Sequence, residues 1–235
     1  FLKKIKNTVM KKYGITLLAA IMVLSSCEND SNKEESPELV VNENAATFKE
    51  IGSITIGGAG AAEISAYDEV SKKLFTVNNS NTNRIDVIDL SNPSSPVFLT
   101  SIDLTPFNGA SNSVATYNGK LAVALEAKPN KQDAGKVVVF DTANYSVIKE
   151  ITVGALPDMI TFSPDGNFIM TANEGEPNDT YSIDPDGSVS IIAVNANYAV
   201  TTLNFGSFSN QLNALKTKGF RIASPTNNFI SDIEP

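Results

Sequence analysis

Short runs of apolar and β-branched residues, each followed by a turn sequence, recur along most of the chain. The clearest unit lies at residues 155–194 and contains apolar runs at 159–162, 168–172 and 188–194. A tight turn rich in Pro, Asp and Gly separates the first two runs, and a long acidic loop separates the last two. Runs of this length with turn residues between them are typical of β-strands. The pattern predicts an all-β fold.

Two earlier segments repeat this plan at a constant spacing. The second runs of the three copies begin 47 residues apart, and the third runs begin 52 residues apart. These starting residues are Leu74, Leu121 and Phe168 for the second runs, and Ile85, Val137 and Val189 for the third runs. A fourth run ends each copy, at residues 97–104, 146–153 and 198–205. Four short strands in about 45 to 50 residues are typical of one β-propeller blade, so the sequence predicts about three blades.

Residues 48–57 form one further apolar run, which resembles a fourth blade strand because its sequence echoes residues 149–154. No first three strands precede it. In a closed propeller such a strand completes the last blade and removes an exposed sheet edge. We therefore expect residues 47–205 to be the N-terminal part of a longer propeller. Residues 206–235 are expected to form a short helix and a connector to the next blade.

The first 26 residues differ from the rest in charge and hydropathy. They carry five lysines and no acidic residue, and an apolar run at 15–24 follows Lys11 and Lys12. This run is too short to span a membrane and matches a signal peptide. Small residues follow it and lead to Cys27, the only cysteine in the chain, as in a bacterial lipobox. We expect residues 1–26 to be a signal peptide and Cys27 to be lipidated, which would attach the protein to a membrane.

Residues 27–46 are polar and acidic, which is typical of a flexible tether between a lipid anchor and a folded domain. Within this segment, Lys33-Glu34-Glu35 resembles the acidic surface-export signal of lipoproteins from the Bacteroidetes group. We therefore expect an exported outer-membrane lipoprotein. It could face either the cell surface or the periplasm.

The predicted blades carry long loops on one face only. Connections between second and third strands are long, whereas the turns between first and second strands are compact. Because binding residues concentrate in long loops on a rigid scaffold, the face with the long loops is the predicted ligand-binding face. Its candidate residues are Glu63, Asn78, Asn79, Asn112, Glu126, Asp158 and Asn173. The ligand class stays open among an extracellular glycan, a protein and a phosphorylated molecule.

The loop at residues 173–187 concentrates five carboxylates, which makes it the candidate metal site. These residues are Glu174, Glu176, Asp179, Asp184 and Asp186. Ca²⁺ takes about six to eight oxygen ligands and tolerates irregular geometry, so Ca²⁺ is the expected cofactor. The alternative is a solvated acidic loop with capping and turn roles, because Asp-Pro-Asp-Gly is also an ordinary turn sequence.

Composition narrows the chemistry further. The net charge of −8 disfavours nucleic acid as a partner, since neutralising phosphates requires a basic surface. The sequence contains no histidine, so it holds neither a Ser-His-Asp triad nor a His-ligated zinc site. Its one cysteine is the expected lipidation site, which leaves no thiol as a nucleophile. The sequence therefore favours a lipid-anchored binding module over an enzyme. The alternatives are a calcium-dependent phosphoesterase and a purely structural surface protein.

Four segments together resemble one family of bacterial exported proteins. They are residues 60–68, 85–96, 153–159 and 173–192. In these segments the chain is similar to the choice-of-anchor I family, with a match that extends over about residues 47–235. The resemblance implies a seven-bladed, quinoprotein-like propeller with a surface role. Some members carry labels that refer to a mesenchyme-specific cell-surface glycoprotein or to alkaline phosphatase, but the family implies no catalytic residues.

Overall fold

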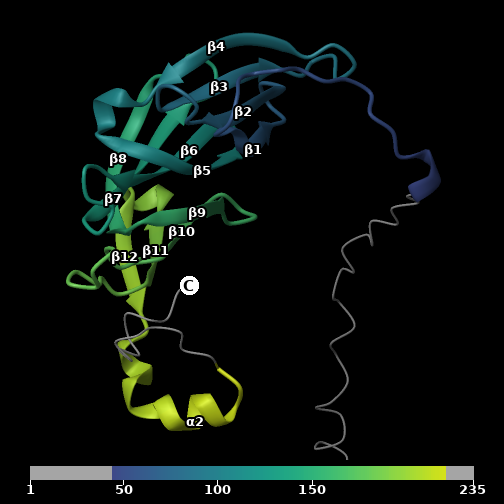
Figure 1. Cartoon of the computed structure of the whole chain (residues 1–235). Helices are drawn as coiled ribbons and strands as arrows, with labels where there is room; N and C mark the ends of the chain where they lie inside the picture. The colour runs from purple at the N-terminus through teal and green to yellow at the C-terminus, as the bar shows by residue number, and fades with distance from the viewer. Residues whose placement is uncertain (1–43, 221–235) are drawn as a thin grey trace, which may run out of the picture. The chain divides into compact units, whose positions relative to one another are not determined.

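The computed structural model describes residues 44–220 of the 235-residue chain (Figure 1). The expectations for residues 1–43 and 221–235, including the signal peptide and the lipidated Cys27, lie outside the described residues. The chain divides into one unit that ends at Lys49 and a second that begins at Glu50. In the first unit the described residues contain a short 3-10 turn, η2 (Ala45–Thr47). All of the described strands belong to the second unit.

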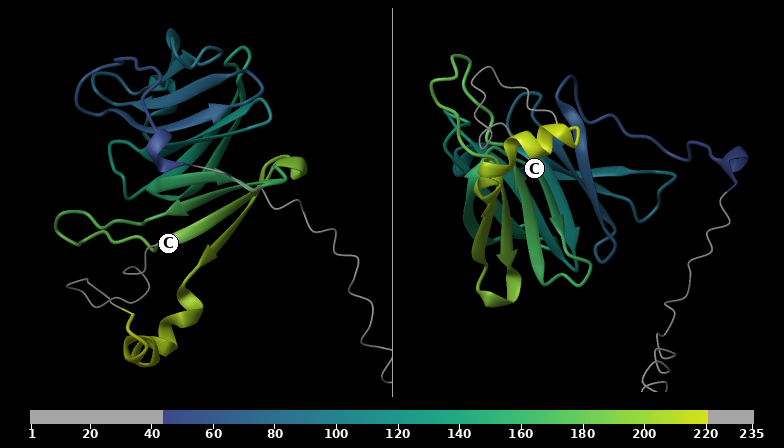
Figure 2. Two further views of the ribbon diagram at one scale, coloured as in Figure 1. Left: turned by 90° about the vertical axis from the view of Figure 1, so that its right-hand side faces the viewer. Right: turned by 90° about the horizontal axis from the view of Figure 1, so that it is seen from below.

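Three four-stranded antiparallel sheets follow one another along this second unit (Figures 1 and 2). Blade 1 contains β1 (Ala61–Asp68), β2 (Lys73–Asn78), β3 (Arg84–Asp89) and β4 (Val97–Asp103). Blade 2 contains β5 (Gly109–Tyr117), β6 (Lys120–Ala127), β7 (Ala134–Asp141) and β8 (Val147–Ala155). Blade 3 contains β9 (Pro157–Phe162), β10 (Phe168–Asn173), β11 (Ser188–Ala193) and β12 (Ala199–Asn204). In each sheet the strands pair in sequence order, as in a propeller blade.

The all-β, propeller-type fold that the repeat predicts is therefore confirmed, with three blades present. Local sequence explains the strand boundaries. At the β9–β10 turn, the Asp165 carboxylate accepts hydrogen bonds from the Ser163 hydroxyl at 2.6 Å and from the Asn167 backbone N–H at 3.0 Å. Gly166 takes the left-handed conformation, with φ of +68°, that favours glycine in tight turns. Strand pairing resumes directly after the turn, where Ile169 faces Phe162.

The middle blade is buried on both faces. On one face of β6, Leu121, Val123 and Leu125 pack in a core cluster with residues of blade 1 that include Phe75 and Val77. On the other face, residues of blade 2 join a cluster with Ile160, Ile169 and Ile192 of blade 3. The blade 2 residues of this second cluster are Ala122, Ala124, Val137, Val139, Ile151 and Val153. Since successive side chains of a strand point to opposite faces, burial on both sides requires the continuous apolar run seen in β6.

A buried carboxylate joins blades 1 and 2 at the end of β1. Asp68 is 2% exposed and accepts hydrogen bonds from the Ser71 hydroxyl at 2.6 Å and the Thr142 hydroxyl at 2.8 Å. It also accepts the backbone N–H groups of Ser71 and, at 3.4 Å, Gly119. Burial alone would raise the pKa of Asp68, but these hydrogen bonds outweigh it and hold the pKa below its ordinary value. Groups from two blades therefore donate hydrogen bonds to one buried carboxylate.

One predicted strand is not formed. Residues 48–57 contain no strand, because a strand needs a neighbour with which to exchange hydrogen bonds and none of the three sheets includes this segment. The segment instead contacts blade 1, where the Asn78 side-chain amide donates to the Ile56 carbonyl at 3.0 Å.

The expected helix near residue 207 is present as a 3-10 turn, η5 (Gly206–Gln211), followed by α2 (Leu212–Thr217). None of the helices in the described part of the chain is long and apolar enough to cross a membrane.

Candidate binding site between the long loops

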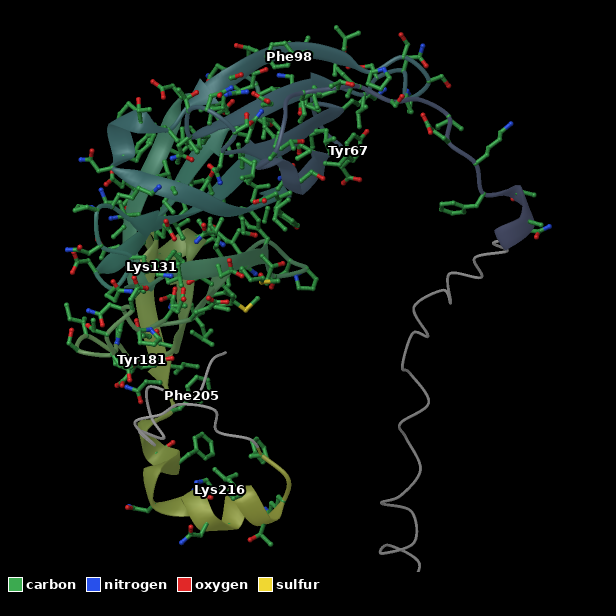
Figure 3. The ribbon with its side chains drawn as sticks, viewed as in Figure 1. Tyr67, Phe98, Lys131, Tyr181, Phe205 and Lys216 are labelled. Carbon is green, nitrogen blue, oxygen red and sulfur yellow. The ribbon has the colours of Figure 1, made fainter. Side chains whose placement is uncertain are left out.

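Two long loops from neighbouring blades form a cleft of about 280 Å³ on the predicted ligand-binding face. One loop connects β6 to β7 and the other connects β10 to β11. The cleft is lined by Glu126, Ala127, Lys128, Pro129, Lys131, Gln132, Asn178 and Asp179. Figure 3 shows Lys131 and Tyr181 on this side of the blades, away from Tyr67. Both loops thus contribute charged and amide side chains to one depression.

Lys131 is the centre of the electrostatics in this cleft. Its ammonium group forms an ion pair with Glu176 of the other loop, and both side chains remain partly exposed. The hydrogen bond to Glu176 raises the pKa of Lys131 above its ordinary value, and the charges of Glu126 and Asp179 act in the same direction. Lys131 therefore stays protonated and neutralises part of the acidic loop.

A second contact ties the two loops together. The Gln132 side-chain amide donates to the Glu176 backbone carbonyl at 3.1 Å. Within the acidic loop, the Asn178 side-chain carbonyl accepts the backbone N–H of Ser182 at 2.9 Å and that of Ile183 at 3.3 Å. The Asn178 backbone N–H in turn donates to the Ile183 carbonyl at 2.9 Å. These bonds close residues 178–183 into a compact turn, so the wall of the cleft is shaped before a ligand arrives.

Of the carboxylates predicted to bind metal, the structure places Asp179 in the cleft and Glu176 against Lys131. Glu174 and Asp184 are half-buried, and Asp186 is exposed. In residues 44–220, no group of three or more Asp, Glu, His or Cys side chains is arranged to hold a metal ion. The Glu176 carboxylate already pairs with Lys131 through one of its oxygens, so a Ca²⁺ ion there would share this carboxylate with an ammonium group. The calcium site stays a prediction based on the composition of the loop.

The asparagines predicted for the ligand-binding face are engaged in internal hydrogen bonds. Asn78 is fully buried and donates to the Asp86 carboxylate at 2.5 Å, and Asn173 is fully buried and donates to the hydroxyls of Ser188 at 3.1 Å and Ser190 at 2.9 Å. The remaining two connect neighbouring blades. Asn79 donates to the Ser111 carbonyl at 2.8 Å, and Asn112 donates to the Pro157 carbonyl at 3.3 Å.

The other predicted residues of this face are carboxylates in three strands. Glu126, at the end of β6, lines the cleft. Glu63 of β1 and Asp158 of β9 are exposed and do not line the cleft. Sequence reasoning missed Lys128, Lys131 and Gln132, although the loop that carries them was recognised as long. One signal was available in the sequence. The β6–β7 loop carries two lysines and the β10–β11 loop carries five carboxylates, so the two loops have opposite charges.

Gly175 provides a stability test for the acidic loop. Its φ is +68°, and a β-carbon there would lie 2.6 Å from the Pro185 carbonyl oxygen and 2.7 Å from the Asp186 carbonyl carbon. We expect Gly175→Ala to lower the free energy of unfolding by about 1 to 3 kcal/mol, because both the backbone and the contact are strained. Urea unfolding measures the loss, and proteolysis within residues 174–187 should become faster.

Gly58→Ala is the matched control for this substitution. A β-carbon at Gly58 would meet no atom within 4 Å, so its unfolding midpoint should stay close to that of the unmodified protein. Equal midpoints for the two variants would contradict the described packing of the acidic loop.

The blades and the cleft define a β-propeller-type protein whose long loops gather on one face. The sequence profile of the choice-of-anchor I domain matches residues 63–235, and the chain belongs to this family. The family and the fold fit a β-propeller of the cell surface. No curated protein matches the chain.

Several solved structures have a similar arrangement of strands. Hydrazine synthase from Kuenenia stuttgartiensis is 14% identical, with a TM-score of 0.36 over 60% of this chain and 53% of that structure. The Pan2 WD40 domain of Neurospora crassa is 13% identical, with a TM-score of 0.42 over 59% of this chain and 38% of that structure. Hsv2 of Kluyveromyces lactis is 9% identical, with a TM-score of 0.37 over 62% and 37%. The chain thus spans about half or less of each structure, and these values are too low to transfer any activity.

Proposed function

We propose that this chain belongs to a lipid-anchored cell-envelope propeller that binds a polar ligand in the cleft between blades 2 and 3. The observation that carries the proposal is the ion pair between Lys131 and Glu176, which holds two long loops around a charged depression. Charged and amide side chains on a rigid β scaffold provide hydrogen bonds to a ligand at low ordering cost. Family membership supports the surface location, and Cys27 supplies the attachment to the membrane.

A hydroxyl-rich ligand suits this cleft better than a strongly anionic one. Lys128 and Lys131 offer donors, whereas Glu126 and Asp179 offer acceptors and oppose the approach of an anion. A glycan presents hydroxyl groups that both donate and accept hydrogen bonds, and it is therefore the first ligand class to test. A protein ligand with mixed charge is the second.

The test is binding of the full chain to an array of immobilised glycans, with Lys131→Ala as the key variant. Loss of a hydrogen bond from a charged group costs about 1.5 to 3 kcal/mol, so the affinity for a bound glycan should fall about tenfold or more. Lys136→Ala is the matched control, because Lys136 forms a similarly exposed ion pair with Glu150, at 2.7 Å, and does not line the cleft. Binding that is unchanged in Lys131→Ala would exclude the cleft as the site.

Calcium assistance is the remaining part of the proposal. If Ca²⁺ binds the acidic loop, added CaCl₂ should raise the melting temperature of the full chain and a chelator should reverse the increase. A melting temperature that does not respond to either addition would remove calcium from the proposal and leave the cleft intact.

A further inference from the structure

A second depression lies on the opposite face of the propeller, between blades 1 and 2. It has a volume of about 400 Å³ and is lined by Tyr67, Asp68, Glu69, Thr116, Tyr117 and Asn118. These residues lie at the turns that join β1 to β2 and β5 to β6. Since these turns are at the other ends of β2 and β6 from the long loops, the groove and the cleft open on opposite faces. Figure 3 shows Tyr67 and Lys131 on opposite sides of the blades.

The groove is held rigid by contacts beneath and beside it. The Tyr117 ring stacks on Phe162, with centroids 5.7 Å apart and an interplanar angle of 29°, and it also lies against Gly166 of blade 3. The Thr116 hydroxyl donates to the Tyr67 backbone carbonyl at 2.7 Å. Asp68 joins both blades at the groove through its bonds to Ser71, Thr142 and Gly119. The lining is therefore organised without a ligand.

The groups that remain available in the groove have a defined chemistry. Tyr67 is 48% exposed, and Glu69 and Asn118 are also exposed. None of the six lining residues is basic, which disfavours phosphate or carboxylate ligands. An exposed aromatic ring offers an electron-rich face, and the exposed carboxylate and amide accept or donate hydrogen bonds.

A neutral sugar matches this set of groups. The C–H face of a sugar ring is apolar and slightly positive, so it packs against the negative face of a tyrosine, while its hydroxyls bond to carboxylate and amide oxygens. The volume of the groove lies within the usual range for small-molecule sites, about 300 to 1,000 Å³. We propose that the groove between Tyr67 and Tyr117 is a second binding site, specific for neutral saccharide units. It is separate from the cleft at Lys131 and does not depend on the function proposed for that cleft.

Affinity electrophoresis of the full chain in gels that contain dextran, laminarin or mannan tests this proposal. At least one of these neutral polysaccharides should retard the unmodified protein. Tyr67→Ala should weaken the retardation at least tenfold, whereas Tyr67→Phe, which keeps the aromatic face, should retain most of it. Phe98→Ala is the matched control, because Phe98 of β4 is also 48% exposed and lines neither the groove nor the cleft, so this variant should behave as the unmodified protein.

Three outcomes would overturn the proposal. The first is the absence of retardation by all three polysaccharides. The second is equal retardation of the unmodified protein and Tyr67→Ala. The third is that no polysaccharide retards the protein but a decaproline peptide binds it, and that Tyr67→Ala abolishes this peptide binding. This result would assign the groove to a proline-rich partner. Lys131→Ala reports on the cleft and Tyr67→Ala on the groove, so the failure of one site is distinguishable from the failure of the other.

Discussion

Replacing Cys27 with alanine should move the protein from the membrane fraction to the soluble fraction. Cys27 is the only cysteine, and it follows an apolar run and small residues in the manner of a lipobox. Each buried methylene of an acyl chain contributes about 0.8 kcal/mol, so loss of several chains removes nearly all of the attachment. Fractionation after labelling of cells with an alkyne analogue of palmitate measures both the location and the lipid.

Ser26→Ala is the control for this experiment. It keeps a small residue before the cysteine, so the protein should still be labelled and should remain with the membrane. The contrary result would be a Cys27→Ala protein that stays in the membrane fraction to the same extent as the unmodified protein. The apolar run at 15–24 would then be the better candidate for the anchor, and the predicted signal-peptide cleavage would be wrong.

We expect Asp68→Ala to lower the free energy of unfolding by about 2 to 4 kcal/mol, because it removes a buried carboxylate that joins two blades. Asp68 accepts hydrogen bonds from blade 1 and blade 2, and Thr142, which is 2% exposed, would be left with a buried hydroxyl and no acceptor there. Hydrogen bonds to a charged group contribute about 1.5 to 3 kcal/mol, and an unsatisfied buried group adds a further penalty. Urea unfolding of the full chain gives the difference.

Two further measurements make this prediction specific. Asp133→Ala changes an exposed aspartate and should alter the free energy of unfolding by less than about 0.5 kcal/mol. The folded-state pKa of Asp68 lies below its unfolded value, so its contribution is present above about pH 4 and is lost as the pH falls through the folded pKa. Asp68→Asn should therefore lose less stability on acidification than the unmodified protein. If the two acid profiles coincide, Asp68 is not the charge that links the blades.

Local chemistry explains how much of the fold was predictable. Blade strands of about four to eight residues were expected from apolar runs, and their turns from residues such as Asp165 and Gly166, whose hydrogen-bond partners lie two or three positions away. Residues 48–57 belong to none of the three sheets, and their pairing with a later blade stays a prediction. Their sequence is suited to a strand, but strand formation depends on a partner that local sequence does not specify.

The sequence predicted which face of the propeller carries the candidate site, but it identified only some of the residues that line the site. Asn79 and Asn112 look like ligand-binding amides in the sequence, but their partners Ser111 and Pro157 lie 32 and 45 positions away. The ion pair between Lys131 and Glu176 likewise joins residues 45 positions apart. Neither kind of contact leaves a periodic or local signal.

The sequence by itself determined the all-β class, the repeat of four strands and the face that carries the long loops, because these properties follow from periodicity and from turn residues close together in the chain. It also determined the candidate lipid attachment at Cys27. Only the tertiary structure showed which polar side chains form hydrogen bonds between blades. It also showed that Lys131 faces the acidic loop and that two tyrosines border a groove on the other face. These arrangements arise when blades pack side by side, since packing brings together residues from separate repeats and buries some of their polar groups.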